Sequence, residues 1–267
     1  MESISSRDNS VVKEARKLKE RKHRDEKKQF LVEGLRFVSE ALGSDFEVSS
    51  LFLSEDMAEK WGALGIEDKI KEDTKVFKLP SRLFREISFT EHPQGIAAVV
   101  NWKGRETKAD EGFFILADRV QDPGNLGTII RSAHASDALG VIITKGTVDV
   151  YNDKVLRSTM GSIFHVPVIE DRELAYLKAL REDGFELVVS SLDTSNDFFQ
   201  VDLTGKVIIA VGNEGAGISA ELMDMADVKV KIPMPGGAES LNVSAAASIM
   251  MFEVVRQKIL KVDNAGK

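Results

Sequence analysis

The sequence of 267 residues contains no cysteine and only four histidines. Without cysteine there is no disulfide, no thiolate metal site and no cysteine nucleophile, which fits a reducing compartment. The histidines are scattered, and neither an H-E-x-x-H pattern nor a pair of carboxylates at ligand spacing occurs, so no metal site is expected. A serine hydrolase is disfavoured because the G-x-S-x-G elbow is missing.

Long apolar runs are missing as well. None approaches the roughly 18 residues that a membrane span needs, and the first ten residues, MESISSRDNS, lack the apolar core of a signal peptide. Hydrophobic residues make up 43% of the chain and charged residues 30%, which is typical of a globular protein in water. We therefore expect a cytoplasmic protein with no membrane partner.

The net charge of −7 argues at first against a nucleic-acid partner. Residues 7–28, however, contain ten Lys or Arg and five Asp or Glu, a local charge of +5 that leaves −12 on the rest of the chain. This basic segment could contact RNA phosphates, because salt screens the acidic body beyond about 8 Å. A solvated helix face with internal ion pairs is the alternative. Composition does not decide between the two.

Residues 1–104 predict a small α/β domain. Asn9 or Ser10 can cap a helix whose apolar stripe runs to Leu18. A second helix is expected over residues 35–42, and Gly43 would end it. Strand-like runs are found at residues 30–34, 48–53, 76–79 and 95–102. The polar segment 103–112 is expected to be a linker.

Residues 105–267 predict a second α/β domain. Apolar, β-branched runs alternate with helix-like stretches, which indicates a mostly parallel sheet covered on both faces. A long final helix is expected over residues 242–261. The strand-like runs are FFILADRV, GVIITKG, HVPVIE, ELVVSS, VIIAVGNE and VKVKIPM.

Three segments of this second domain stand out. They are DPGNLGTIIRSA (122–133), VGNEGAGIS (211–219) and IPMPGGAESLNVSAAAS (232–248), and each places a Gly- or Asn-bearing turn directly after a strand-like run. Ligands bind at the carboxyl ends of strands in open parallel sheets. We therefore expect one site built from three loops. Its candidate residues are Asn125, Arg131, Glu214, Ser240 and Asn242.

Each candidate residue also has a purely structural explanation. Asn125 could cap a helix, and Arg131 could be a surface ion-pair partner. Glu214 could be a first-turn residue favoured by the helix dipole, and Ser240 or Asn242 could cap the final helix. The segment GNEGAG is not a P-loop, since no Gly-Lys-Ser/Thr follows, and DPGNLG is not a G-x-G-x-x-G turn.

The motifs N-L-G-T-I-I-R, G-N-E-G-A-G-I and S-L-N-V-S-A-A-A-S, in this order, resemble the three motifs of the SpoU (TrmH) family of RNA ribose 2′-O-methyltransferases, which belong to the SPOUT class. The resemblance covers about residues 113–260. The stretch TEHPQGIAAVV (90–100) is similar to one in the substrate-binding domain that often precedes this fold.

The resemblance implies several properties that residue spacing alone does not. The second domain would contain a deep trefoil knot, a rare exception to the rules of chain topology. The cofactor would be S-adenosylmethionine, and the enzyme would be a homodimer with its active site near the subunit interface. By motif position, the residues against the cofactor would be Gly212, Ile232 and Leu241, together with Asn213, Gly217 and Pro233.

The resemblance also implies roles for the candidate catalytic residues. The arginine matching Arg131 is assigned to deprotonation of the ribose hydroxyl in the family. Because the pKa of a normal arginine lies above about 12, we expect Arg131 instead to clamp an RNA phosphate and stabilise the developing alkoxide. Asn125 would orient the ribose or hold Arg131, and Glu214 would fix a loop or Arg131. Ser240 and Asn242 would complete the pocket.

The sequence leaves alternatives for the substrate and the function. Ribosomal RNA is the expected substrate because of the added N-terminal module, with transfer RNA as the alternative. A non-catalytic RNA-binding homologue is a second alternative, against which the complete set of candidate residues speaks. A nucleotide-binding dehydrogenase is a third, and the missing G-x-G-x-x-G turn speaks against it. The final helix is apolar on more than one face, which fits either a dimer interface or burial within one chain.

Overall fold

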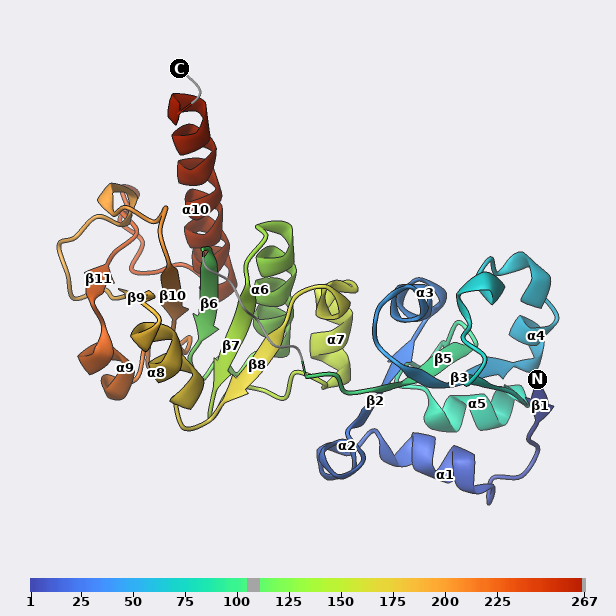
Figure 1. The fold of residues 1–267 in the computed structure, drawn as a ribbon. Coiled ribbons are helices and arrows are strands. Elements are labelled where there is room, and N and C mark those ends of the chain that lie inside the picture. The colour runs from blue at the N-terminus through green and yellow to red at the C-terminus, as the bar shows by residue number, and fades with distance from the viewer. Residues whose placement is uncertain (105–110, 266–267) are drawn as a thin grey trace. The chain divides into compact units, whose positions relative to one another are not determined.

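The computed structural model describes residues 1–104 and 111–265 (Figure 1). The chain forms two compact units. The first unit comprises Met1–Gly104 and Tyr151–Phe164, and the second comprises Arg105–Val150 and His165–Lys267. Most of the predicted linker, residues 105–110, lies outside the described residues.

The first unit is built on a mixed five-stranded sheet in the order β1-β4-β3-β5-β2. Strands β1, β4 and β3 are parallel, whereas β5 runs antiparallel to both β3 and β2. The four strands predicted from the sequence are confirmed as β2 to β5, whereas the two-residue strand β1 was not predicted. The bounds are β1 (Glu2–Ser3), β2 (Gln29–Glu33), β3 (Val48–Ser54), β4 (Lys75–Leu79) and β5 (Ile96–Asn101).

Helices pack around this sheet. The predicted cap of the first helix is confirmed, because Asn9 Oδ1 accepts a hydrogen bond of 2.8 Å from the backbone N–H of Val11. Val12 and Ala15 form its buried stripe. The helices are α1 (Ser10–Lys17), α2 (Arg21–Lys27), α3 (Leu35–Gly43), α4 (Glu55–Ala58), α5 (Ser81–Ile87) and α7 (Asp153–Thr159). Helices α2, α4, α5 and α7 were not predicted, since each is too short for a clear apolar period.

The segment Tyr151–Phe164 packs with the first unit, although it lies in the sequence range 105–267 assigned to the second domain. The ring of Tyr151 stacks on both Phe30 and Trp102, with centroid distances of 4.6 Å in each case. The ring of Phe164 contacts Phe37 at 5.4 Å. Aromatic burial therefore draws a distant piece of chain into this unit, and no local sequence pattern announces such a contact.

The second unit contains the predicted parallel sheet. All five strand pairs are parallel, in the order β11-β9-β10-β6-β7-β8. The residues of β6, β7 and β10 are all buried, which explains their continuous apolar, largely β-branched sequences. The strands are β6 (Phe113–Ala117), β7 (Gly140–Thr144), β8 (Val168–Asp171), β9 (Glu186–Ser190), β10 (Val207–Val211) and β11 (Val228–Val230).

The strand order reverses between β6 and β10. The chain runs outward from β6 through β7 to β8, and then forms β9 and β10 on the other side of β6. The carboxyl ends of β6 and β10 therefore lie side by side, at the kind of switch point where parallel sheets bind ligands. The helices of this unit are α6 (Pro123–Ala135), α8 (Ala175–Glu182), α9 (Ala220–Met225) and α10 (Val243–Ala265).

Helix α10 has both a buried and an exposed apolar side. Ala247, Met250 and Val254 are fully buried, and the helix packs on α6 and β10. Ile249 and Phe252 are 38% and 48% exposed. Burial within the chain thus accounts for only part of its apolar surface. In the described part of the chain, no helix, α10 included, has the length and apolar character that a bilayer span requires.

Candidate active site

The carboxyl ends of β9, β10 and β11 surround a cavity of about 750 Å³. Its walls come from the turns that follow these strands and from the segment leading into α10. The second and third motifs therefore meet in one place, as predicted. The predicted site residues that line it are Gly212, Asn213, Glu214, Gly217, Ile232, Ser240, Leu241 and Asn242. Pro233 is not among the lining residues.

Asn125 connects the first motif to the other two. Its Nδ2 donates a hydrogen bond of 2.8 Å to Glu214 Oε1. Its Oδ1 accepts a bond of 2.9 Å from Asn242 Nδ2. The three polar side chains thus form a continuous chain across all three motifs. Glu214 fixes Asn125 in this arrangement, and its carboxylate accepts a hydrogen bond from Asn125 rather than from Arg131.

Helix capping and site formation are combined in Asn242. Its Oδ1 accepts hydrogen bonds from the backbone N–H groups of Ser244 (2.9 Å) and Ala245 (3.3 Å) at the start of α10. The predicted cap at Asn242 is therefore confirmed. Since the amide oxygen is committed to the helix, the amide nitrogen is left to donate to Asn125. Ser240 is exposed on the cavity wall.

Asn125 itself does not cap a helix. Helix α6 begins at Pro123, with Asp122 rather than Asn125 as its N-cap. The carboxylate of Asp122 accepts a hydrogen bond of 2.8 Å from the Asn125 backbone N–H. Proline suits this first turn because it has no N–H to leave unsatisfied. The side chain of Asn125 is therefore available for the contacts with Glu214 and Asn242.

Arg131 lies exposed on α6. Within the described part of the chain its guanidinium makes no hydrogen bond or ion pair, so the surface ion-pair explanation finds no partner there. Arg131 is six residues beyond Asn125, which places it roughly 9 Å further along the helix and about 120° around it. Arg131 and Asn125 thus face different directions.

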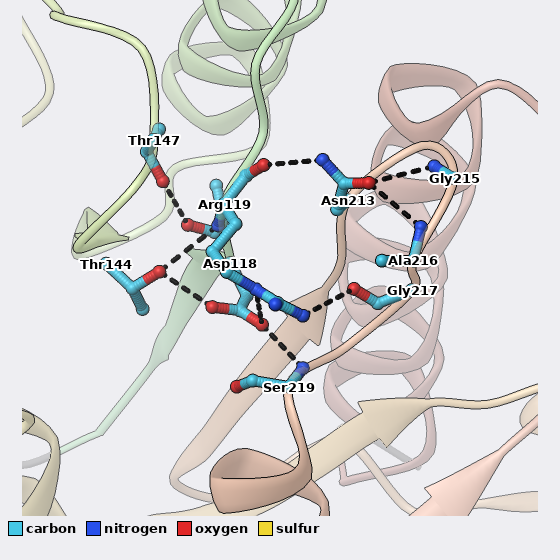
Figure 2. A network of polar contacts seen from close by, with 10 residues as sticks. Asp118, Arg119, Thr144, Thr147, Asn213, Gly215, Ala216, Gly217 and Ser219 are labelled. Carbon is cyan, nitrogen blue, oxygen red and sulfur yellow. Dashed lines mark hydrogen bonds and ion pairs between the residues drawn. The ribbon is translucent and has the colours of Figure 1, made fainter.

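A buried carboxylate that the sequence analysis missed holds the second motif in place (Figure 2). Asp118, only 2% exposed, directly follows β6. Its carboxylate accepts hydrogen bonds from Thr144 Oγ1 (2.7 Å) and from the backbone N–H of Ser219 (2.7 Å). It thereby joins the ends of β6 and β7 to the turn after β10. An aspartate at the end of an apolar strand was the signal that could have found it.

Arg119 continues this network on the other side of the turn (Figure 2). Its backbone is in the left-handed region, with φ at +55°. Its carbonyl oxygen accepts a hydrogen bond of 2.9 Å from Asn213 Nδ2. Asn213 Oδ1 in turn accepts from the backbone N–H groups of Gly215 and Ala216, each at 2.9 Å. The predicted cofactor residue Asn213 therefore shapes the turn from within.

Gly212 is required by the turn itself. A Cβ atom at this position would lie 2.3 Å from the carbonyl carbon of Gly217 and 2.4 Å from the nitrogen of Ile218. The turn closes through two backbone hydrogen bonds between Asn213 and Gly217, of 2.9 and 3.0 Å. The close approach expected at Gly212 is thus to the chain's own backbone. The absence of a side chain at Gly212 lets the two sides of this turn pack closely together.

The basic segment, residues 7–28, spans α1 and α2, and most of its charges are matched inside the first unit. Glu86 contacts both Arg7 (3.1 Å) and Arg16 (3.0 Å). Arg24 is buried and donates to the carbonyl oxygens of Leu18 and Lys19. Other ion pairs join Lys13 to Asp8, Arg21 to Asp25, and Lys17 and Lys27 to Glu14. These contacts favour the internally paired face over an open phosphate-binding stripe.

In residues 1–104 and 111–265 there is no group of three or more His, Asp or Glu side chains that could hold a metal ion. The polar groups around the cavity are amides, hydroxyls, single carboxylates, the Lys231 ammonium and backbone groups. Such a set suits an organic ligand better than a metal.

The chain matches two known protein families. Residues 112–252 match the SpoU rRNA Methylase family, and residues 9–98 match the MRM3-like substrate binding domain. The chain is 35% identical over 254 residues to the 23S rRNA (guanosine(2553)-2′-O)-methyltransferase RlmP of Bacillus subtilis. This match covers 95% of the chain and 99% of the relative.

Two solved structures that contain the cofactor are similar throughout. One is the AdoMet-bound rRNA methyltransferase of Sinorhizobium meliloti, with a TM-score of 0.83, 32% identity, and coverage of 96% of this chain and 97% of that one. The other is the SpoU methyltransferase AviRb of Streptomyces viridochromogenes with AdoMet, with a TM-score of 0.83, 30% identity, and coverage of 94% and 98%.

The fold, the loops and these relatives together define an S-adenosylmethionine-dependent RNA ribose 2′-O-methyltransferase, and the predicted fold class, enzyme class and cofactor are confirmed. The chain belongs to the SpoU rRNA methylase family.

Proposed function

We propose that this protein methylates a ribose 2′-hydroxyl of ribosomal RNA at the site formed by the three motif loops. The observation that carries the proposal is the hydrogen-bonded chain Asn242–Asn125–Glu214, whose two end residues line a cavity of about 750 Å³. It joins the three segments that the sequence singled out. RlmP and a Streptomyces viridochromogenes relative, a 23S rRNA (uridine(2479)-2′-O)-methyltransferase, support ribosomal RNA as the substrate.

The cavity suits S-adenosylmethionine. Its volume lies within the range of about 300–1,000 Å³ that is usual for small-molecule sites. We assign Gly212, Ile232 and Leu241 to the cofactor, since the narrow turn at Gly212 leaves backbone groups at the cavity wall. When bound, S-adenosylmethionine supplies an electrophilic methyl group on its sulfonium.

Side chains of the three motifs would then position the RNA. Arg131 carries a charged guanidinium that makes no hydrogen bond or ion pair with the described residues, so it can bind a phosphate and stabilise negative charge on the hydroxyl oxygen. Asn125 would orient the ribose, because both ends of its amide are fixed by hydrogen bonds. Ser240 would add a hydroxyl at the cavity wall. Precise positioning of reacting atoms is a large part of catalysis in group transfer.

Two further features of the prediction belong to this proposal. A homodimer is supported by the exposed apolar side of α10, where Ile249, Phe252 and Ile259 are 38–57% exposed. It is supported also by Arg131, which faces away from Asn125 of its own chain and could serve a neighbouring one. The trefoil knot is supported by the similarity to SPOUT-class relatives. An RNA substrate of this kind would place the reaction in the cytoplasm.

Transfer RNA is the second candidate substrate. The Aquifex aeolicus TrmH/SpoU tRNA modifying enzyme has a TM-score of 0.52 and covers 58% of this chain. The rRNA methyltransferase from Sinorhizobium meliloti covers 96%. The full-length match therefore favours ribosomal RNA.

The decisive experiment measures transfer of labelled methyl groups from S-adenosylmethionine to ribosomal and transfer RNA fractions. It compares wild type with Arg131→Ala. We expect label in ribosomal RNA that disappears in the variant, while S-adenosylmethionine binding measured by calorimetry is retained. Full activity of Arg131→Ala would contradict its role. Label in transfer RNA alone would contradict ribosomal RNA as the substrate. If RNA from cells lacking the protein also takes up no label, the non-catalytic alternative is supported.

A further inference from the structure

The first unit contains a cavity of about 430 Å³ for which the proposed function gives no role. It lies where β3 ends and before β5 begins. Three segments line it: residues 54–60 around α4, residues 81–85 of α5, and residues 91–95. The last of these belongs to the TEHPQG stretch. A cavity of this volume can hold a small organic group.

Close packing keeps the wall of this cavity in place. A Cβ atom on Gly95, whose φ is +83°, would lie 2.3 Å from Ser54 Oγ, so the 91–95 segment packs directly against the end of β3. Gln94 Oε1 accepts a hydrogen bond of 2.9 Å from the backbone N–H of Leu35 at the start of α3. The apolar floor consists of buried Phe84 with half-buried Met57 and Pro93.

Three exposed basic side chains line the cavity: Lys60, Arg85 and His92. None of the three makes a hydrogen bond or ion pair with a residue in the described part of the chain. This contrasts with the basic segment, where most cations already have acidic partners. Binding a phosphate here would therefore break no existing ion pair.

Two exposed carboxylates, Asp56 and Glu91, share this rim and are likewise unpaired among the described residues. They would repel a bare phosphate ion. Carboxylate oxygens accept hydrogen bonds well from the amino groups of adenine, cytosine and guanine, whereas uracil has no amino group to offer. The rim thus fits a ligand that carries a phosphate, a flat ring and an amino donor together.

We propose that this cavity binds one unpaired, amino-bearing nucleotide of the RNA substrate. The base would lie on Met57 and Pro93, with its amino group toward Asp56 or Glu91 and its phosphate at Lys60 and Arg85. The nucleotide must be unpaired, because proteins read base edges in RNA chiefly where the bases are splayed out of a helix. This inference rests on the proposed function in taking RNA as the substrate.

The test measures binding of fluorescent 12-nucleotide homopolymers of A, C and U to the full chain, over a range of salt concentrations. We expect A and C to bind about fivefold more tightly than U, the effect of about one hydrogen bond. Asp56→Asn with Glu91→Gln should remove this preference. Lys60→Ala with Arg85→Ala should weaken binding and lower the salt slope by about 0.7, the value for one neutralised phosphate on single-stranded RNA.

The matched control is Lys22→Ala with Arg82→Ala, which removes the same charge from exposed positions that do not line the cavity. This control should keep the wild-type slope. All variants should keep the wild-type thermal unfolding of the first unit, followed by the fluorescence of Trp61 and Trp102, which shows that this unit is folded. Ultraviolet cross-linking of 5-iodocytidine, which keeps the amino group, placed in the C homopolymer should map to residues 54–60 or 91–95.

Three outcomes would each contradict the proposed nucleotide pocket. They are equal affinities of wild type for the A, C and U homopolymers, equal salt slopes in the two basic double variants, or cross-links confined to other segments. If wild type still methylates RNA in that case, only the pocket is refuted. Absence of both RNA binding and methyl transfer would instead refute the proposed function.

Discussion

The amide of Asn242 donates a hydrogen bond of 2.9 Å to the amide oxygen of Asn125, a residue 117 positions earlier in the chain. The direction of this bond is fixed at both ends. Asn242 Oδ1 is already used by the N–H groups of α10, and the Glu214 carboxylate can only accept from Asn125 Nδ2. The start of α10 therefore determines how Asn125 is presented at the site.

Asn242→Asp separates the two tasks of this residue. The new carboxylate keeps the helix cap and is favoured by the helix dipole, so we expect the unfolding free energy to stay within about 0.5 kcal/mol of wild type. It cannot donate to Asn125, and it adds a negative charge beside the chain that leads to Glu214. Methyl transfer should fall on the order of tenfold, the equivalent of about 1.4 kcal/mol.

Asn242→Ala is the matched comparison for this prediction. It removes the cap as well and should lower stability by about 1 kcal/mol. Thermal unfolding and methyl-transfer rates measured on both variants distinguish the two effects. An Asn242→Asp protein with full activity would show that the hydrogen bond to Asn125 is dispensable.

Asp118→Asn tests the network beneath the cofactor turn. The carboxylate accepts from Thr144 Oγ1 and from the Ser219 N–H, and an amide of the same shape can accept at only one of its two ends. We expect a loss of about 1–3 kcal/mol in unfolding free energy, because a buried donor is left without a partner. Since Ser219 follows the turn that lines the cavity, the affinity for S-adenosylmethionine should fall too.

Thr144→Val serves as the control for Asp118→Asn, since it removes one donor from the same carboxylate but leaves the Ser219 contact intact. It should destabilise the protein with little change in S-adenosylmethionine affinity. If both variants bind the cofactor as tightly as wild type does, Asp118 has no positioning role.

Gly212→Ala and Gly215→Ala form a pair within one turn. At Gly212 the added Cβ would collide with the backbone of Gly217 and Ile218 at 2.3–2.4 Å, and backbone cannot move aside cheaply. At Gly215 the nearest atom is Asn213 Oδ1 at 3.7 Å, an ordinary contact. We expect Gly212→Ala to abolish detectable S-adenosylmethionine binding by calorimetry and Gly215→Ala to leave it nearly unchanged. Equal behaviour of the two variants would contradict this account.

The sequence predicted the second unit well, because each buried strand leaves a local apolar run and each loop a local motif. Glycine and asparagine at strand ends sufficed to indicate that Glu214 and Asn242 belong to one site. The contacts between these loops could not be predicted in the same way. That Asn125, and not Arg131, pairs with Glu214 depends on where α6 begins, and this start is set by a cap at Asp122 instead of the possible cap at Asn125.

The first unit was harder to read. Its short helices α4 and α5 lack a period, and the segment Tyr151–Phe164 joins it through aromatic contacts that sequence distance conceals. The local charge of +5 on residues 7–28 was also a poor guide to RNA binding. The partner of Arg7 and Arg16 is Glu86, which lies outside this segment on α5. The net charge of a segment does not predict RNA binding when acidic residues from elsewhere in the fold neutralise it.

The basic segment also predicts a response to acid. Hydrogen bonds from Lys17, and after it Lys27, lower the pKa of Glu14 from its ordinary 4.5 to about 2. A group with a lowered folded-state pKa contributes its stability above pH 4.5 and loses it as the pH falls toward 2. Wild type should therefore lose more stability than Glu14→Gln across this window. The effect should be modest, because the Glu14 side chain is 42% exposed and water screens its ion pairs.

Tryptophan fluorescence can isolate this effect, since both tryptophans of the chain, Trp61 and Trp102, lie in the first unit. Urea unfolding of wild type and Glu14→Gln would be followed by tryptophan emission at several pH values between roughly 5 and about 2.5. The lowered pKa of Glu14 affects stability within this pH range. The difference between the two proteins should shrink toward acid and also at about 1 M salt, where the screening length is near 3 Å. Parallel curves at every pH would mean that the Glu14 pairs add nothing to folding, and the first unit would then owe its acid sensitivity to other carboxylates.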